Sequence, residues 1–209
     1  MNLTNYYWFF KSVIPHRICD DIVKYAISIK DQLATTGGYG DPTKLNKRQI
    51  KDLKKKRDSN IVWLNERWIY NEIQPYVHQA NTNAGWNFQW DWSESCQFTK
   101  YEKGQYYDWH CDGWDKPYLR QEGHPANGKV RKLSVTVSLS DQKDYKGGEL
   151  EFDFRNLDPD KKPNIKKCKE ILPKGSLVVF PADVWHRVCP VKKGIRHSLV
   201  VWNLGWPFK

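Results

Sequence analysis

Several kinds of segment are missing from this sequence of 209 residues, and each absence narrows the class of protein. No run of about 18 apolar residues occurs, so no membrane-spanning helix is expected. The first residues contain neither a basic segment nor an apolar core, so we expect no secretory signal peptide. The five cysteines are scattered and form no Cys-x-x-Cys pair, which argues against a disulfide framework and a cysteine-type zinc site. These absences predict a cytoplasmic protein, and its small size suits a microbial or phage origin.

Positive charge is in excess, with 34 Lys and Arg residues against 24 Asp and Glu residues and a net charge of +10. Much of the excess lies in residues 44–57, with eight basic residues and one acid, and in residues 161–169, with five basic residues. A nucleic-acid site is one interpretation, and an acidic protein partner is another. The first segment lacks the interleaved aromatic residues on which single strands stack. We therefore favour two solvated surface segments.

The order of hydrophobic patterns predicts a mainly β protein with N-terminal helices, in a single domain. Residues 18–26 and about 66–80 have helical spacing, and Pro75 is expected to kink or shorten the second helix. We interpret residues 1–86 as a helical support region and residues 87–209 as a double-stranded β-helix, the jelly-roll or cupin-like core. The connection 113–129 is long enough to be a lid. The expected strands are 88–92, 96–101, 106–111, 133–139, 149–154, 176–180, 186–191 and 197–204.

One imidazole and one carboxylate stand two residues apart at His110 and Asp112. On an extended strand this spacing places both side chains on the same face. A distant second imidazole, His186, completes a set of two histidines and one carboxylate, which is typical of non-haem Fe(II) oxygenases. A single histidine in a strand is more often an ordinary structural residue. His110 and His186 differ because they occur together with Asp112 and with Arg196.

The second half of the chain resembles the 2-oxoglutarate and Fe(II)-dependent dioxygenases, specifically the prolyl 4-hydroxylase-like superfamily. The resemblance covers roughly residues 101–202, and its five motifs occur in the order of that family. They are Tyr101-x-x-Gly104-x-x-Tyr107-x-x-His110-x-Asp112, Arg131-Lys-Leu-Ser-Val-Thr-Val-Ser-Leu139, Gly147-Gly-Glu-Leu-x-Phe152, Pro173-x-Gly175-x-Leu177-x-x-Phe180 and His186-Arg-Val-x-Pro190-Val-x-x-Gly194-x-Arg196-x-Ser198-Leu199.

This resemblance implies a ligand set and a cosubstrate site. His110, Asp112 and His186 match the family's Fe(II) ligands, and 2-oxoglutarate and O2 take the open metal positions. Arg196 matches the residue that pairs with the far carboxylate of 2-oxoglutarate, for which a planar guanidinium is suited. Ascorbate, which commonly restores oxidised iron in this family, is an expected further cofactor.

Other site residues are expected on the same basis. Tyr101 matches a tyrosine that hydrogen-bonds the cosubstrate. Ser138 stands where some members of the family have a tyrosine, and Thr136 is the alternative donor on the same strand face. Trp114 and Arg187 are candidates for the substrate rim, where the alternatives are ordinary packing and a solvated charge.

The resemblance implies hydroxylation of an unactivated C–H bond, and we favour a prolyl residue of a peptide or protein as the substrate. The fold does not determine the substrate, so three alternatives stay open. The first is the same chemistry on a free amino acid or another small molecule, and the second is nucleic-acid oxidation. The third is a non-catalytic jelly-roll module that binds a metal or ligand. The sequence does not indicate an oligomeric state.

Overall fold

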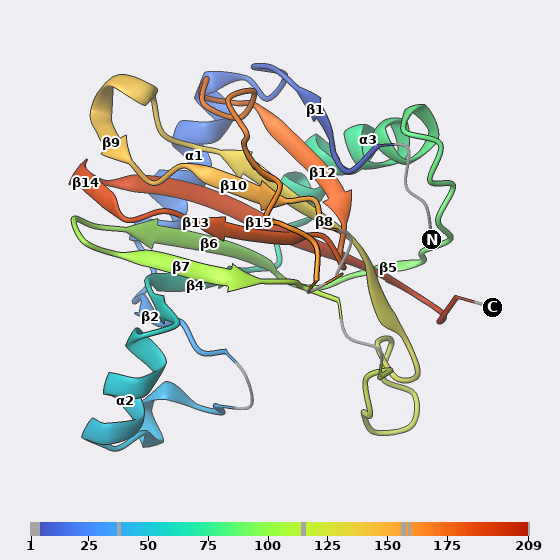
Figure 1. The fold of residues 1–209 in the computed structure, drawn as a ribbon, viewed down its shortest axis with the longest axis horizontal. Coiled ribbons are helices and arrows are strands. Elements are labelled where there is room, and N and C mark those ends of the chain that lie inside the picture. Colours follow the sequence, from blue (N-terminus) through green and yellow to red (C-terminus); the bar gives the residue numbers. More distant parts are fainter. Residues whose placement is uncertain (1–4, 37–38, 114–115, 156–157, 159, 209) are drawn as a thin grey trace.

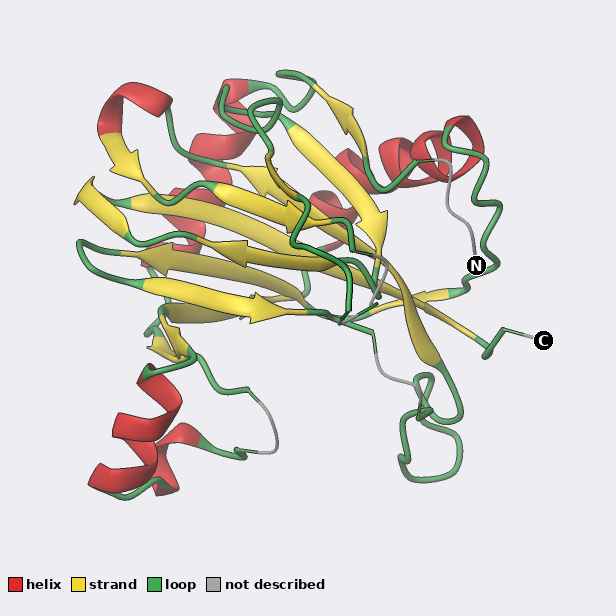
Figure 2. Cartoon of the chain, in the orientation of Figure 1, coloured by secondary structure: helices red, strands yellow, loops and turns green. Residues whose placement is uncertain are grey.

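The computed structural model describes residues 5–36, 39–113, 116–155, 158 and 160–208. Its ribbon is dominated by antiparallel strands, with two helices packed on one side and a third on a projecting lobe (Figures 1 and 2). The helices are α1 (His16–Ile27), α2 (Lys47–Lys54) and α3 (Arg67–Asn83), with 3-10 turns η1 (Pro42–Lys44) and η2 (Gln142–Asp144). The strands are β1 (Trp8–Phe10), β2 (Gln32–Leu33), β3 (Arg57–Asp58), β4 (Asn60–Leu64), β5 (Trp92–Ser93), β6 (Cys96–Tyr101), β7 (Tyr106–His110), β8 (Val130–Ser138), β9 (Tyr145–Gly147), β10 (Leu150–Asp153), β11 (Ile165–Lys167), β12 (Leu177–Pro181), β13 (Trp185–Val188), β14 (Val191–Gly194) and β15 (Arg196–Gly205).

Two antiparallel sheets form the core. The major sheet has the strand order β1-β12-β8-β15-β6-β4-β2, with β5 paired to β15. The minor sheet has the order β11-β10-β13-β7-β3, and β14 pairs with β9 in a separate ribbon. Strands distant in sequence are neighbours in both sheets, as the crossing connections of a jelly roll require. The predicted double-stranded β-helix is confirmed.

The major sheet has an apolar outer face and a polar inner face, because side chains alternate along each strand. In β8, Leu133, Val135 and Val137 belong to the core cluster that the helices cover. The residues between them, including Ser134 and Thr136, are buried on the other face, toward the minor sheet. This alternation places hydroxyl groups inside the sandwich, where the candidate site lies.

Helices α1 and α3 pack their apolar stripes on the outer face of the major sheet. In α3, Ile69, Ile73, Val77 and Ala80 are almost fully buried at helical spacing. The helix continues through Pro75 to Asn83. The predicted shortening at Pro75 therefore does not occur. Among the described residues, no helix combines the length and apolarity that crossing a bilayer requires.

The N-terminal half contributes more β structure than its sequence pattern predicts. Strands β1 to β4 lie within residues 8–64, and β4 extends the major sheet beside β6. The strand predicted at residues 88–92 is wrong for most of its length. Asn87 has a φ of 53°, and the side chain of Asn81 bonds both the N–H and the carbonyl oxygen of Phe88. These contacts hold the segment in a turn.

Candidate active site

Two neighbouring strands, and the short segment that follows one of them, bring together the predicted metal ligands. His110 ends β7 and pairs directly with His186 of β13 in the minor sheet. Asp112 lies just beyond β7, where its N–H donates to the carbonyl oxygen of Ala182 at 2.8 Å. One donor atom from each of His110, Asp112 and His186 lies within 4.8 Å of the others. The sequence prediction that these three side chains converge agrees with this geometry.

Backbone carbonyl groups orient both imidazoles. Nδ1 of His110 lies 2.7 Å from the carbonyl oxygen of Asp108, and Nδ1 of His186 lies 3.0 Å from that of Val184. Because a carbonyl oxygen only accepts, both Nδ1 atoms carry the proton, and the Nε2 lone pairs are left for a ligand. The two Nε2 atoms lie 3.8 Å and 3.6 Å from the oxygens of Asp112.

The charges at this site are set by burial and by the neighbouring groups. Burial, followed by the nearby charge of His186, lowers the pKa of His110 to about 3, so His110 is neutral at pH 7. Burial alone raises the pKa of Asp112, but electrostatic interactions with His186, His110 and Arg131 outweigh it and bring this pKa to about 2. A neutral imidazole and an ionised carboxylate are the forms that bind a metal.

The donor set fits a ferrous ion on chemical grounds. Two imidazole nitrogens and one carboxylate, grouped on one side of a cavity, are the ligands of non-haem Fe(II) oxygenases. The hydroxyl of Ser134, on the inner face of β8, donates to Oδ2 of Asp112 at 2.7 Å. This hydrogen bond fixes the carboxylate, as supporting contacts around metal ligands commonly do. Sequence patterns gave no signal for Ser134 beyond its inward strand position.

A guanidinium lies in the same cavity as the three ligands. Arg196 begins β15, is 4% exposed, and donates through Nη1 to Oγ of Ser198 at 3.1 Å. It pairs across the sheet with Tyr101, and its Cζ lies 5.4 Å from the tyrosine ring centroid. Gly148 leaves room for it, since a Cβ there would lie 2.9 Å from Cδ of Arg196. The cavity, about 30 Å³, also contains Thr136 in its wall.

The remaining predicted site residues have different positions. Ser138 is buried, and its hydroxyl lies 3.5 Å from the carbonyl oxygen of Ser140, whereas Thr136 borders the cavity. Arg187 is bound elsewhere: it donates to Glu151 at 2.8 Å and lies over Trp109. Strand alternation turns Arg187 to the face opposite His186, and its role at the substrate rim stays a prediction. Trp114 lies outside the described residues.

Sequence reasoning missed Arg57 as a site residue. Arg57 belongs to the basic segment 44–57, which the sequence pattern predicts to be solvated. The other basic residues of this segment, from Lys44 to Lys56, are exposed as expected. Arg57 is 3% exposed and borders the cavity that contains His110, Asp112 and His186. A possible signal was its place beside β4, where the apolar run Ile61-Val62-Trp63-Leu64 begins.

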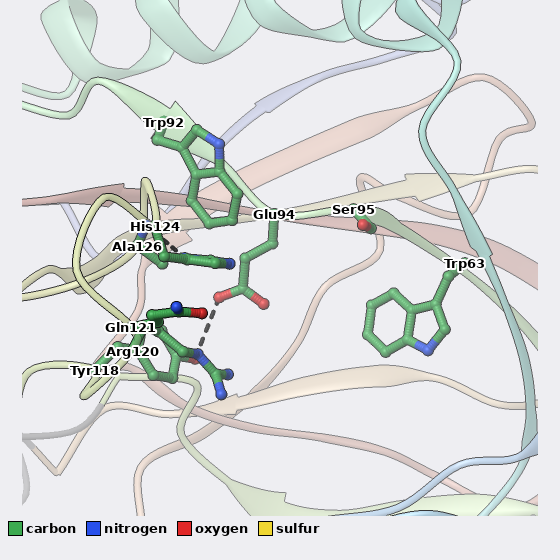
Figure 3. A pocket seen from close by; sticks show the side chains of 9 residues that line it. All are labelled: Trp63, Trp92, Glu94, Ser95, Tyr118, Arg120, Gln121, His124 and Ala126. Carbon is green, nitrogen blue, oxygen red and sulfur yellow. Dashed lines mark hydrogen bonds between the residues drawn. The ribbon is translucent and has the colours of Figure 1, made fainter.

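A second, larger cavity of about 500 Å³ lies beside the first. Trp63, Trp92 and Tyr118 provide much of its apolar wall, and Glu94 and Arg120 add charge (Figure 3). Residues of the long connection 113–129 form one side of this cavity, which is the place where a lid was predicted. Backbone hydrogen bonds join residues within the described part of this connection, for example from the N–H of Tyr118 to the carbonyl oxygen of Lys129.

Trp202 connects the two cavities. Its indole borders the metal-ligand cavity and lies 6.3 Å from the ring of Trp63, which borders the larger cavity. Arg131 stacks on the same indole at 3.8 Å and pairs bidentately with Glu94 at 2.6 and 2.7 Å. The ring pair of Trp63 and Trp202 therefore lies between the larger cavity and the metal-ligand cavity.

Comparison with known proteins agrees with this geometry. The model of the 2OG-Fe(II) oxygenase superfamily matches residues 96–203, which is more than half of the chain. This chain belongs to the 2OG-Fe(II) oxygenase superfamily. The resemblance inferred from the sequence motifs is confirmed. Membership implies Fe(II), 2-oxoglutarate and O2 as the reacting partners of the cavity that contains His110, Asp112 and His186.

Individual relatives of this oxygenase are hydroxylases. The PKHD-type hydroxylase YbiX of Escherichia coli is 35% identical over 106 residues, which is 50% of this chain and 40% of the relative. The viral collagen prolyl hydroxylase of Paramecium bursaria Chlorella virus-1, solved with 2OG, has a TM-score of 0.64 and 21% identity, covering 97% of both chains.

A third similar structure has a peptide bound. The prolyl hydroxylase of Trichoplax adhaerens, solved with a fragment of a hypoxia-inducible factor, has a TM-score of 0.67 and 16% identity. It covers 96% of this chain and 84% of that one. At these identities the two solved structures establish the fold of this oxygenase and nothing finer. The sequence match likewise spans less than half the length of the curated relative.

Proposed function

We propose that this oxygenase hydroxylates an unactivated C–H bond in a reaction that consumes 2-oxoglutarate and O2. The overall reaction converts R–H, 2-oxoglutarate and O2 into R–OH, succinate and CO2, with one oxygen atom of O2 in each of the first two products. The observation that supports it is the placement of His110, Asp112, His186 and Arg196 around one cavity. Bound iron supplies the oxidising chemistry, and the protein positions and protects the reactants.

Each residue of the cavity has a proposed role. His110, Asp112 and His186 hold Fe(II) from one side. Arg196 is oriented by Ser198 and buried away from water. It pairs with the far carboxylate of 2-oxoglutarate, since a buried charge needs a hydrogen-bonded partner of opposite charge. Tyr101 and Thr136 border the same space and donate hydroxyl hydrogen bonds to the cosubstrate.

A prolyl residue in a peptide or protein is the substrate that we favour. The cavity of about 500 Å³ on the other side of the Trp63–Trp202 ring pair is large enough for several residues of chain, and its indole and phenol rings suit contact with proline rings. The relatives named above are PKHD-type and prolyl hydroxylases. A free amino acid is the second candidate.

Succinate formation tests this function. The protein, supplied anaerobically with Fe(II) and 2-oxoglutarate and then exposed to O2, is screened against peptide, amino-acid and nucleic-acid pools. We expect succinate that requires both Fe(II) and 2-oxoglutarate, stimulation by proline-containing peptides, and longer turnover with ascorbate. Absence of any Fe(II)-dependent succinate would instead support a non-catalytic binding module, and stimulation by amino acids alone would favour the second candidate.

A further inference from the structure

Arg57 is held in the wall of the metal-ligand cavity by contacts that leave part of its guanidinium unused. It lies on β3, the edge strand of the minor sheet, and pairs across the strand with Tyr107. Its Nε donates to Oγ of Ser59 at 2.9 Å. Its Cζ lies 4.5 Å from the ring centroid of Tyr107, and that ring stacks on His110 with centroids 3.5 Å apart. Arg57 is thus fixed two stacked groups away from the metal position.

The guanidinium of Arg57 is incompletely satisfied. Its Nη2 is buried and has no hydrogen-bond partner among the described residues. The adjacent carboxylate, Asp58, pairs with Lys54 at 3.2 Å and not with Arg57. Arg131, another buried arginine near the site, shows the usual arrangement, because it forms a bidentate pair with Glu94. A buried charged donor without an acceptor lowers the stability of the free protein. Such a donor is expected in a binding site, because the bound ligand supplies the acceptor.

The position of Arg57 separates it from the group assigned to the cosubstrate. Arg196 begins β15 of the major sheet, whereas Arg57 lies on β3 of the minor sheet. In the proposed function, one carboxylate of 2-oxoglutarate pairs with Arg196 and the other lies at the metal. No third carboxylate remains on this cosubstrate for Arg57. This leaves the molecule that is hydroxylated as the candidate source of the acceptor.

We propose that Arg57 is a substrate-binding residue that donates to a carbonyl-type oxygen next to the carbon that is hydroxylated. In a peptide this oxygen is a backbone carbonyl, and in a free amino acid it is the carboxylate. The planar guanidinium fits either acceptor. The inference rests on the proposed function, and it identifies what the substrate must carry: an oxygen acceptor within reach of β3 when its C–H bond faces the metal.

The test compares two kinetic constants in Arg57→Gln and Arg57→Lys. Each variant is assayed for the cosubstrate KM in turnover of 2-oxoglutarate without substrate, and for the KM of the peptide that best stimulates the unmodified protein. Loss of a hydrogen bond to a charged donor predicts a peptide KM raised about ten- to a hundredfold in Arg57→Gln, with a smaller rise in Arg57→Lys. The cosubstrate KM stays within about twofold. Arg48→Gln, which removes an exposed arginine of the same basic segment, is the matched control and changes neither constant.

A second measurement separates binding from a structural role. The peptide is resynthesised with a thioamide, a weaker acceptor, in place of the carbonyl that follows the hydroxylated residue. This change should raise the peptide KM of the unmodified protein more than that of Arg57→Gln, because the variant has already lost the interaction. Equal effects in both proteins would make Arg57 structural.

The remaining outcomes distinguish the inference about Arg57 from the proposed function. A raised cosubstrate KM with an unchanged peptide KM would assign Arg57 to the cosubstrate. Stimulation of the unmodified protein by no peptide, but by free proline with an Arg57-dependent KM, would support the inference with a carboxylate as the acceptor. No Fe(II)-dependent succinate in the unmodified protein would refute the proposed function itself.

Discussion

Removal of the Ser134 hydroxyl should weaken metal binding without removing any ligand. Ser134 is fully buried, and its hydroxyl lies 2.7 Å from Oδ2 of Asp112. A hydrogen bond to a charged group contributes about 1.5–3 kcal/mol, which corresponds to roughly a ten- to hundredfold change in affinity. Loss of a contact that orients a metal ligand has an effect of similar size, about 10- to 100-fold. We therefore expect Ser134→Ala to raise the Kd for Fe(II) by about that factor.

The assay is an anaerobic Fe(II) titration of the unmodified protein, Ser134→Ala and a control. Ser176→Ala is the matched control, since Ser176 is also fully buried and its hydroxyl accepts a hydrogen bond, from the N–H of Ser12, outside the site. Both variants should lose some unfolding free energy, but only Ser134→Ala should bind iron more weakly. The same Kd in both variants would refute the idea that this hydroxyl positions the carboxylate.

Three further predictions concern the cosubstrate, acid stability and a close backbone contact. Arg196→Ala should raise the cosubstrate KM by about tenfold or more in assays of 2-oxoglutarate turnover while Fe(II) affinity is unchanged; an unchanged KM would place the far carboxylate elsewhere. Burial, with the charges of Lys100 and Arg196, lowers the pKa of His197 to about 4. The unfolded chain, with a histidine pKa near 6.5, then takes up this proton first, so the unfolding free energy should fall as the pH drops from about 6.5 to about 4. His197→Phe should show a smaller fall in urea titrations across that range, and an equal fall would contradict this. Gly175→Ala should cost more than about 1 kcal/mol in the same titrations, because Gly175 has a φ of +77° and a Cβ would lie 2.1 Å from a backbone oxygen, that of Ile14; Gly40→Ala, with open space around it, is the control.

The parts of the fold that follow local patterns could be predicted from the sequence. The strand at residues 96–101 has the predicted bounds, and the alternation in residues 133–137 placed serine and threonine on the inner face. His110 and Asp112 do lie together, although β7 ends at His110 and the position of Asp112 is set by the bond from its N–H to the carbonyl oxygen of Ala182. The second histidine and Arg196 required the family resemblance, since no local rule relates residues so distant in sequence.

The parts that depend on distant contacts were not predicted. Strand β3 has two residues and exists because it pairs with β7, so its pattern carries no signal of its own. The prediction that Arg57 is solvated was wrong for this reason. Runs of charged residues are usually exposed, but the pairing of β3 with β7 buries this one residue. The turn at Asn87 similarly depends on the side chain of Asn81, six residues away.

Every role proposed for this oxygenase depends on one ferrous ion bound jointly by His110, Asp112 and His186. Anaerobic equilibrium dialysis of Fe(II) against the purified protein, with 2-oxoglutarate present, measures that binding itself. We predict one tightly bound ion per chain, lost in His110→Ala and Asp112→Ala and retained in Asp183→Ala, which removes an exposed carboxylate close to His186 in sequence. Undiminished iron binding by the His110 and Asp112 variants, or its loss in the Asp183 variant alone, would contradict the assignment of these three ligands.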